Sequence, residues 1–398
     1  MYFLTRTFYP VGQGAFYAER FIECNCSRPF TVVYDCGSGK NLNQPENALL
    51  TQIKKFYKEN SVIDILFISH FHSDHINGIK ELSTHCVIKN IVVPALDQDT
   101  IGIYEKTIAA ANNNTSQSEA FKEIKQIIDC SLDPKKLLSN NDNVKVIRIK
   151  SIPKGDANSD ENTNDGIEYD KISDNTEINS GTPINIHNTQ YCFWKYIPFN
   201  YGENSLKADL SAEGFIKDGK INVEFFKREF KKLIRFYKGK FKGYSNENSL
   251  SVASIPVDKY YIFLKNSEFT KCFKLRYRNP NNKIFGCMYF GDSNLKNNKL
   301  LNKIQKTNGI TGLISTIQIP HHGSEKSFNC DIFKIFMKHH VAVISFGLGN
   351  EYKHPSKEVS DRIIKEKKRL FTVTQNPNSI HEESVWFFNT KYYHCSKS

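Results

Sequence analysis

The sequence contains no apolar run close to the roughly 20 residues that a membrane-spanning helix requires, so we do not expect a membrane protein. Its first residues lack the charged, apolar and small-residue segments of a secretory signal. The ten cysteines are few for 398 residues, and the one close pair, Cys24 and Cys26, lacks the two-residue spacing of a zinc knuckle. These absences argue against a disulfide scaffold and favour free thiols in the cytoplasm.

Acidic residues are also in deficit. The chain has 42 Asp and Glu against 54 Lys and Arg, which gives a net charge of +12. Such a balance favours a polyanionic partner such as nucleic acid. The chain is also rich in Lys and Asn, a bias that an A/T-rich genome produces without functional demand. The charge therefore favours nucleic acid only modestly.

Four side chains that can bind metal lie close together, directly after a buried hydrophobic strand predicted at residues 64–68. On an extended backbone His70 and His72 point to the same side and can share one ion, whereas Asp74 and His75 in the following turn can serve a second ion nearby. Imidazole suits zinc and related divalent cations, and carboxylate completes a mixed nitrogen and oxygen set. Surface histidines are the simpler alternative, but such clustering of the chain's 12 histidines favours metal.

The patterns along the chain predict one layered α/β domain that covers residues 1–398. Strands alternate with helices over the first hundred residues, where a helix is expected from about residue 45. Strand patterns return after residue 245, with helical stretches near 331–338 and 356–367. The expected strands are 2–9, 15–22, 30–34, 64–68, 88–93, 144–149, 191–198, 249–255, 260–264, 284–290, 313–319 and 341–346.

Residues 98–245 interrupt this rhythm and are expected to form a large helical or irregular insertion. Within it, residues 154–182 are rich in Asp, Asn and Ser and predict a loop or disordered segment. Residues 222–242 predict a basic amphipathic helix. The basic side chains of such a helix more often form a solvated face than a nucleic-acid contact.

Two further predicted strands end in residues that can bind metal. Asp292 follows one of them through a glycine, and His321 and His322 follow another between a proline and a glycine. Loops at one end of a sheet are where such sites are assembled. Asp292 has the alternative role of a turn residue or helix N-cap, and the two histidines have that of exposed loop residues. Three strand ends with ligands of the same kind favour a shared site.

The run His-Phe-His-Ser-Asp-His at residues 70–75 resembles the H-x-H-x-D-H signature of metallo-β-lactamase-fold hydrolases. This resemblance implies a four-layer αββα sandwich, here with a large helical or irregular insertion. Further blocks resemble, in the same order, the soluble metallo-β-lactamase domain of ComEC-type DNA-uptake proteins and their stand-alone relatives. These blocks are residues 11–14, 246–252, 290–292, 319–324 and 352–355.

The resemblance also implies two divalent metal ions, with zinc expected and manganese the alternative. Asp292 would bridge the ions, and Asp35 would support the metal loop through hydrogen bonds. Most members have another histidine before the bridging aspartate, but the matching residues 246–249 contain none, so Asn248, water or substrate would complete the first site, or that site would bind metal weakly. The expected ligands are His70, His72 and Asp292 for the first ion, and Asp74, His75, Asp292 and His322 for the second.

Two such ions would activate a water for attack on phosphorus, which implies a metal-dependent phosphodiesterase or nuclease acting on nucleic acid. Asp74 would orient this water or accept its proton, and His321 and Ser324 would contact the phosphate. His354 would protonate the leaving oxygen or grip a phosphate, unless it is a plain loop histidine. The alternatives are a hydrolase of a small ester, lactone or thioester, and a catalytically weak protein that docks through the insertion in a multiprotein system, for example in defence.

Overall fold

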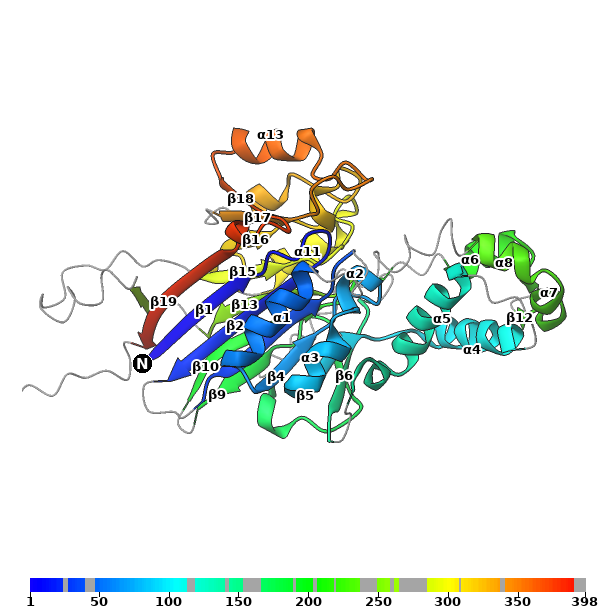
Figure 1. Cartoon of the computed structure of the whole chain (residues 1–398), viewed down its shortest axis with the longest axis horizontal. Helices are drawn as coiled ribbons and strands as arrows, with labels where there is room; N and C mark the ends of the chain where they lie inside the picture. Colours follow the sequence, from blue (N-terminus) through cyan, green and yellow to red (C-terminus); the bar gives the residue numbers. More distant parts are fainter. Residues whose placement is uncertain are drawn as a thin grey trace, which may run out of the picture.

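The structure is a computed structural model, and two β-sheets lie face to face at its centre with helices on their outer faces (Figure 1). Three clusters of buried apolar side chains separate these layers: one between the sheets, one under the helices of each sheet. This arrangement confirms the predicted αββα sandwich. The structure describes residues 1–23, 28–39, 47–112, 119–139, 143–152, 166–188, 191–202, 206–217, 220–236, 249–257, 261–264, 285–307, 309–336 and 341–389.

The first sheet has nine strands. They span Tyr2–Phe8 (β1), Phe16–Glu23 (β2), Phe30–Cys36 (β3), Val62–Phe67 (β4), Val87–Pro94 (β5), Lys145–Lys150 (β6), Thr176–Asn179 (β8), Tyr261–Leu264 (β14) and His381–Asn389 (β19). Their order is β14-β19-β1-β2-β3-β4-β5-β6-β8. The half from β3 to β8 is parallel, so the loops that follow these strands emerge at one edge.

The second sheet has eight strands. They span Ile167–Glu168 (β7), Ile184–His187 (β9), Cys192–Phe199 (β10), Ser251–Pro256 (β13), Gly286–Tyr289 (β15), Ile314–Gln318 (β16), Val341–Ser345 (β17) and Arg369–Val373 (β18). Their order is β18-β17-β16-β15-β13-β10-β9-β7, and β15 to β18 are parallel. A separate hairpin pairs Ile216–Lys217 (β11) with Lys220–Ile221 (β12).

The helices outside the sheets follow local sequence signals. Asn47, for example, caps α1 by accepting the backbone N–H of Leu49 at 2.9 Å, and Leu49, Ile53 and Phe56 bury one face of that helix. The helices are Ala48–Glu59 (α1), Ser73–Ile76 (α2), Ile79–His85 (α3), Gln98–Asn112 (α4), Glu119–Leu132 (α5), Leu206–Ala212 (α6), Val223–Arg228 (α7), Phe230–Phe236 (α8), Asn298–Lys306 (α11), Ile332–Ile335 (α12) and Lys357–Lys365 (α13), with 3₁₀ turns at Pro134–Leu137, Tyr169–Lys171, His321–Gly323 and Pro377–Ser379.

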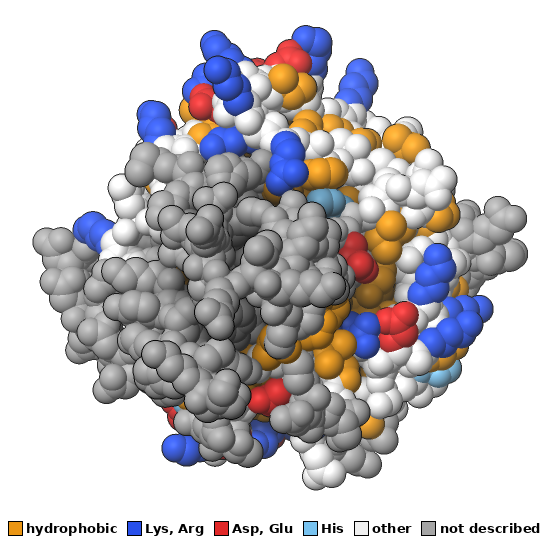
Figure 2. All heavy atoms as spheres, turned by 90° about the vertical axis from the view of Figure 1, so that its left-hand side faces the viewer, with side chains coloured by type: hydrophobic (Ala, Val, Ile, Leu, Met, Phe, Trp, Pro, Cys, Tyr) orange, Lys and Arg blue, Asp and Glu red, His pale blue; other side chains and the backbone are white. Residues whose placement is uncertain are grey.

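Helices α4 to α8 form a lobe that projects from one end of the sandwich (Figure 1). At the top of the molecule, α13 exposes lysine and arginine side chains beside acidic ones (Figure 2). Two of these cations are neutralised within the helix, because Lys357 pairs with Asp361 and Arg362 pairs with Glu366. We therefore regard this face as a solvated surface. In the part of the chain that the structure describes, every helix is too short or too polar to cross a bilayer.

The structure differs from the expected insertion in two respects. Strands β6 to β10 all lie between residues 98 and 245, yet they belong to the two central sheets; β6 and β10 were expected as strands, whereas β7, β8 and β9 were not. Of the helix expected at 222–242, the described residues form two short helices, α7 and α8, which Glu229 separates with non-helical backbone angles, and residues 237–242 lie outside the described chain. Of the expected loop at 154–182, residues 167–168 and 176–179 are strands, and residues 153–165 lie outside the described chain.

A buried ion-pair network joins the two sheets. Arg6 is fully buried, and it donates to Glu19 at 2.6 Å and to Glu383 at 2.9 Å. Both acids stand directly opposite Arg6 in the neighbouring strands β2 and β19. Glu19 also accepts hydrogen bonds from three hydroxyls of the second sheet: Tyr196 at 2.5 Å, Ser254 at 2.6 Å and Tyr289 at 3.0 Å. One carboxylate thus fixes the two sheets relative to each other.

Replacement of Arg6 by leucine leaves the Glu19 carboxylate buried without its cation. We expect this change to lower the free energy of unfolding by about 3–5 kcal/mol, measured by urea denaturation. The control is Arg20→Leu, because Arg20 pairs with Glu59 on the surface, where Glu59 is 65% exposed, and an exposed pair contributes at most about 1 kcal/mol. Equal losses in the two variants would contradict a special role for the buried pair.

Candidate metal centre

The candidate site residues follow four strand ends at one edge of the sandwich. Asp35 lies near the end of β3, residues 70–75 follow β4, Asp292 follows β15, and His321 and His322 follow β16. Two cross-sheet hydrogen bonds hold these loops together, because Leu250 N–H donates to the Ser69 carbonyl at 2.8 Å and the Tyr34 hydroxyl donates to the Leu250 carbonyl at 2.6 Å. The two sheets therefore contribute to one site.

The Asp35 carboxylate organises the loop after β4. It accepts hydrogen bonds from the Ser69 backbone N–H at 2.7 Å, the Ser69 hydroxyl at 2.7 Å and His75 Nδ1 at 2.8 Å. Burial raises the pKa of Asp35, although His75 and Ser69 oppose this rise. Asp35 also has a positive φ of 56°, a conformation that Asp tolerates better than most residues. Its position agrees with the supporting role expected from the sequence.

The hydrogen bonds around the histidines assign their tautomers. The Ser69 hydroxyl gives its proton to Asp35, so it accepts from His70 Nδ1 at 3.0 Å. His75 Nδ1 faces Asp35, and His322 Nδ1 faces the Ser345 carbonyl at 2.9 Å, which can only accept. In each neutral ring the lone pair is therefore on Nε2. Such hydrogen bonds are those that orient histidine ligands of metals.

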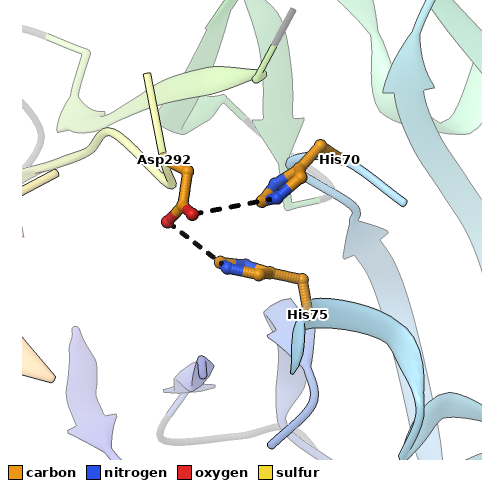
Figure 3. A group of neighbouring side chains, drawn as sticks. All are labelled: His70, His75 and Asp292. Carbon is orange, nitrogen blue, oxygen red and sulfur yellow. Dashed lines mark ion pairs between the residues drawn. The ribbon is translucent and has the colours of Figure 1, made fainter. Parts of the chain in front are cut away.

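The Nε2 atoms of these three histidines all face the Asp292 carboxylate. Its carboxylate oxygens lie 3.3 Å from His75 Nε2, 3.8 Å from His322 Nε2 and 3.9 Å from His70 Nε2, and Figure 3 shows its two oxygens directed separately at His70 and His75. The turn before it requires glycine, since Gly291 has a φ of +55° and an added Cβ would lie 2.6 Å from Ser249 Oγ. The Asp292 N–H donates to the same Ser249 hydroxyl at 3.1 Å.

Asp74 faces the same centre from the loop after β4. Its Oδ2 lies 3.5 Å from His322 Nε2, and its side chain is 26% exposed. Gly14 packs against its backbone, because an added Cβ at Gly14 would lie 2.4 Å from the Asp74 carbonyl oxygen. Asp74 therefore lies between the buried histidines and solvent.

Two groups of side chains could each hold a metal ion, with all ligand atoms of a group within 4.8 Å of one another. One consists of His70, His75 and Asp292, and the other of Asp74, His75 and His322. The Nε2 atoms of His75 and His322 are buried and make no hydrogen bond. Lone pairs that face carboxylate oxygens without a hydrogen bond, in a set of nitrogen and oxygen donors, fit a divalent cation such as zinc.

The electrostatics of the site favour positive charge at its centre. Burial lowers the pKa of His75, but Asp292, Asp35 and Asp74 outweigh burial and raise it well above its ordinary value. Likewise, burial raises the pKa of Asp292, but the neighbouring histidines hold it well below its usual range. The carboxylates therefore remain ionised and attract a cation, whether a proton on imidazole or a metal ion.

His72 lies outside both groups, which differs from the expected first site of His70, His72 and Asp292. His75 instead belongs to both groups. His72 Nδ1 nevertheless lies 3.0 Å from His70 Nε2. Two ligands of one ion at about 2.0–2.1 Å have a similar separation, so His72 can share an ion with His70.

The residues that we expected to contact the substrate differ in their exposure to solvent. His321 is 27% exposed, and its Nε2 lies 3.7 Å from Asp292 Oδ2. His354 lies beside it, with ring centroids 5.7 Å apart. Ser324 is only 3% exposed, so its hydroxyl is poorly placed to touch a substrate. Asn248 lies outside the described residues.

Sequence reasoning missed the residues that orient the candidate ligands. Ser69 directly precedes the signature, and its position next to His70 could have indicated that it orients this histidine. Gln318 accepts the backbone N–H groups of Phe290 and Gly291 at 2.7 and 2.8 Å, which fixes the turn that leads to Asp292. No sequence pattern marks this contact, because it joins side chain and backbone across two strands.

Removal of one Asp35 oxygen tests whether its hydrogen bonds hold the centre together. Asparagine tolerates the positive φ of this position, so Asp35→Asn keeps the backbone but loses an acceptor. We expect the affinity for Zn²⁺, measured by titration calorimetry, to fall about 10–100-fold. The control is Asp64→Asn, because Asp64 is also fully buried but binds Arg28 and Thr31 at the other end of β4. Unchanged affinity in Asp35→Asn would contradict the assignment.

The comparison with protein families agrees with this architecture. Residues 29–151 match the Metallo-beta-lactamase superfamily. The crystal structure of unliganded yeast PDE1 superimposes with a TM-score of 0.41 at 11% sequence identity, covering 97% of this chain and 100% of that chain. A comparison with curated protein sequences gave no match. Residues 29–151 are thus a Metallo-beta-lactamase superfamily match within a chain that has the metallo-β-lactamase fold.

Proposed function

We propose that this protein is a metal-dependent hydrolase that cleaves phosphodiester bonds, with nucleic acid as its substrate class. The observation that carries the proposal is the convergence of the His70, His75 and His322 lone pairs on the carboxylates of Asp74 and Asp292. The superfamily match supports metal-dependent hydrolysis. Zinc fits the histidines best, and manganese is the alternative for a site with several oxygen donors.

A divalent ion bound by these residues would supply a water with a pKa lowered toward ~7 and a positive charge that faces the substrate. Asp74 is the residue that we assign to the orientation of this water, because its side chain reaches both solvent and the buried histidines. Burial raises the pKa of Asp74, but His75 and His322 lower it far below its ordinary value. The Asp74 carboxylate is therefore ionised at pH 7 and can accept a hydrogen bond from the water.

His354 contributes a neutral imidazole to the open side of the site. Burial, together with the charges of His321 and His322, lowers the pKa of His354 to about 4. A cation nearby would lower it further, so the ring carries no acidic proton at pH 7. We therefore assign His354 a hydrogen bond to a phosphate oxygen in preference to protonation of the leaving group.

The open side of the site favours an anionic substrate. Asp74 and His321 are its partly exposed members, at 26% and 27%. The exposed Lys326 lies close enough for its charge to lower the pKa of His354. Together with the net charge of +12, this cation favours a polyanion over a neutral ester. The order of the sequence blocks described above is the basis on which we include a relationship to ComEC-type domains in the proposal.

Removal of His75, which belongs to both candidate groups, provides the sharpest test of this function. The Zn²⁺- or Mn²⁺-loaded protein is incubated with single- and double-stranded DNA, RNA, bis(p-nitrophenyl) phosphate, a thioester and a lactone. We expect cleavage of phosphodiesters, and we expect His75→Ala to lose more than the roughly 10²–10⁴-fold that a single proton-transfer group contributes.

The matched control is His85→Ala. His85 is a surface histidine that stacks on Tyr57 and pairs with Glu81, so its removal is expected to leave the rate unchanged. Hydrolysis of the thioester or lactone with no cleavage of any phosphodiester would refute the proposed substrate class. Equal rates for His75→Ala and the wild type would refute the proposed centre.

A further inference from the structure

Four imidazoles face the Asp292 carboxylate, two at each of its oxygens. Oδ1 faces His75 Nε2 at 3.3 Å and His322 Nε2 at 3.8 Å. Oδ2 faces His70 Nε2 at 3.9 Å and His321 Nε2 at 3.7 Å. The side of Oδ1 also has Asp74, whereas the side of Oδ2 has His72 beside His70. His321 therefore lies on the side of Oδ2. This is the side of the first site, for which the family resemblance implies a further histidine that residues 246–249 do not contain.

The backbone of the loop after β16 separates the two adjacent histidines. His321 and His322 both have positive φ values, of 50° and 56°, which is uncommon for two consecutive residues other than glycine. Their rings consequently diverge, with centroids 6.2 Å apart and planes at 68°. This divergence lets one histidine face each oxygen of Asp292. Such strained backbone is found mainly where function requires it.

The His321 ring is held in this orientation from two sides. Its Nδ1 lies 2.8 Å from the Ser327 hydroxyl, and its backbone N–H donates to the Gly291 carbonyl at 3.0 Å, directly before Asp292. When Nδ1 donates to Ser327, the lone pair on Nε2 faces Oδ2. This is the same relation between an outer hydrogen bond and an inner lone pair that His75 has with Asp35.

We propose that His321 is a ligand of the first metal ion, with His70, His72 and Asp292, and takes the place of the histidine missing at residues 246–249. This inference rests on the proposed metal-dependent function. It replaces the phosphate contact expected from the sequence. The geometric reason is that His321 Nε2 faces Asp292 Oδ2 at 3.7 Å, as His70 Nε2 does at 3.9 Å.

The experiment counts bound metal in variants of the loop. His321→Asn is the main variant, because asparagine tolerates positive φ and its amide is a poor zinc ligand. The wild type, His321→Asn, His322→Asn and His354→Asn are dialysed against Zn²⁺ alone, and metal per chain is measured by mass spectrometry. Co²⁺ substitution then reports the ligand field of each ion by its visible absorption, which is independent of activity.

We expect two ions in the wild type and in His354→Asn. In His321→Asn one ion should remain, with the other weakened by more than the roughly 10–100-fold that loss of an outer hydrogen bond costs. The Co²⁺ spectrum that remains should differ from the one that remains in His322→Asn, since the two variants empty different sites. A melting temperature close to that of the wild type in the absence of metal confirms that His321→Asn is folded.

Two ions of unchanged affinity in a folded His321→Asn would overturn the inference, as would a wild type that binds a single ion. These outcomes are separable from failure of the proposed function. A wild type that binds two ions, loses one in His321→Asn and hydrolyses no phosphodiester would support the ligand and refute the substrate. A wild type that cleaves phosphodiesters while His321→Asn keeps both ions would support the proposed substrate and refute His321 as a ligand.

Discussion

The registration of the two sheets is the constraint on which the candidate centre depends, and the Glu19 carboxylate sets it. Glu19 is held by Arg6 within the first sheet, and it accepts the Tyr289 hydroxyl of β15 from the second. Tyr289 lies three residues before Asp292, the carboxylate that faces histidines from both sheets. An interaction in the middle of the sandwich therefore controls the distance between loops at its edge. A shift of one sheet along the other would separate Asp292 from His70.

The centre itself depends on hydrogen bonds that decide where imidazole protons reside. Asp35 binds His75 directly and His70 through Ser69, and a backbone carbonyl binds His322. Each contact places a proton on Nδ1 and leaves Nε2 for the interior. Burial alone would keep the histidines neutral and would protonate the carboxylates. The proximity of the two kinds of group reverses both tendencies, since it raises the pKa of His75 and His322 and lowers the pKa of Asp74 and Asp292. The carboxylates therefore keep their negative charge, and that charge attracts a cation.

The sequence predicted the fold class and the strand ends because both leave local signals: apolar runs, glycines and the H-x-H-x-D-H signature. It predicted β6 and β10 as strands but not β7, β8 and β9, and it could not predict which strands pair, because β-pairing is not encoded in a local pattern. The ligand groups depend on rotamers and backbone angles as well. His72 was expected in the first group and stands beside it, whereas His321, expected at the substrate, faces Asp292. Adjacent residues 321 and 322 have the same identity, yet their Nε2 atoms face different oxygens of Asp292, and this arrangement depends on a turn in which both residues have positive φ.

The segment of residues 246–249 contains no histidine, and the structure describes only its last residue. Ser249, its last residue, accepts the Asp292 N–H at 3.1 Å, and its carbonyl accepts the Ser293 hydroxyl at 3.0 Å. Ser249 thus helps to position the Asp292 carboxylate, while His321 and His322 would provide one ligand to each candidate ion from a single turn. A turn with two such residues couples the sites mechanically, since any movement of its backbone displaces both rings.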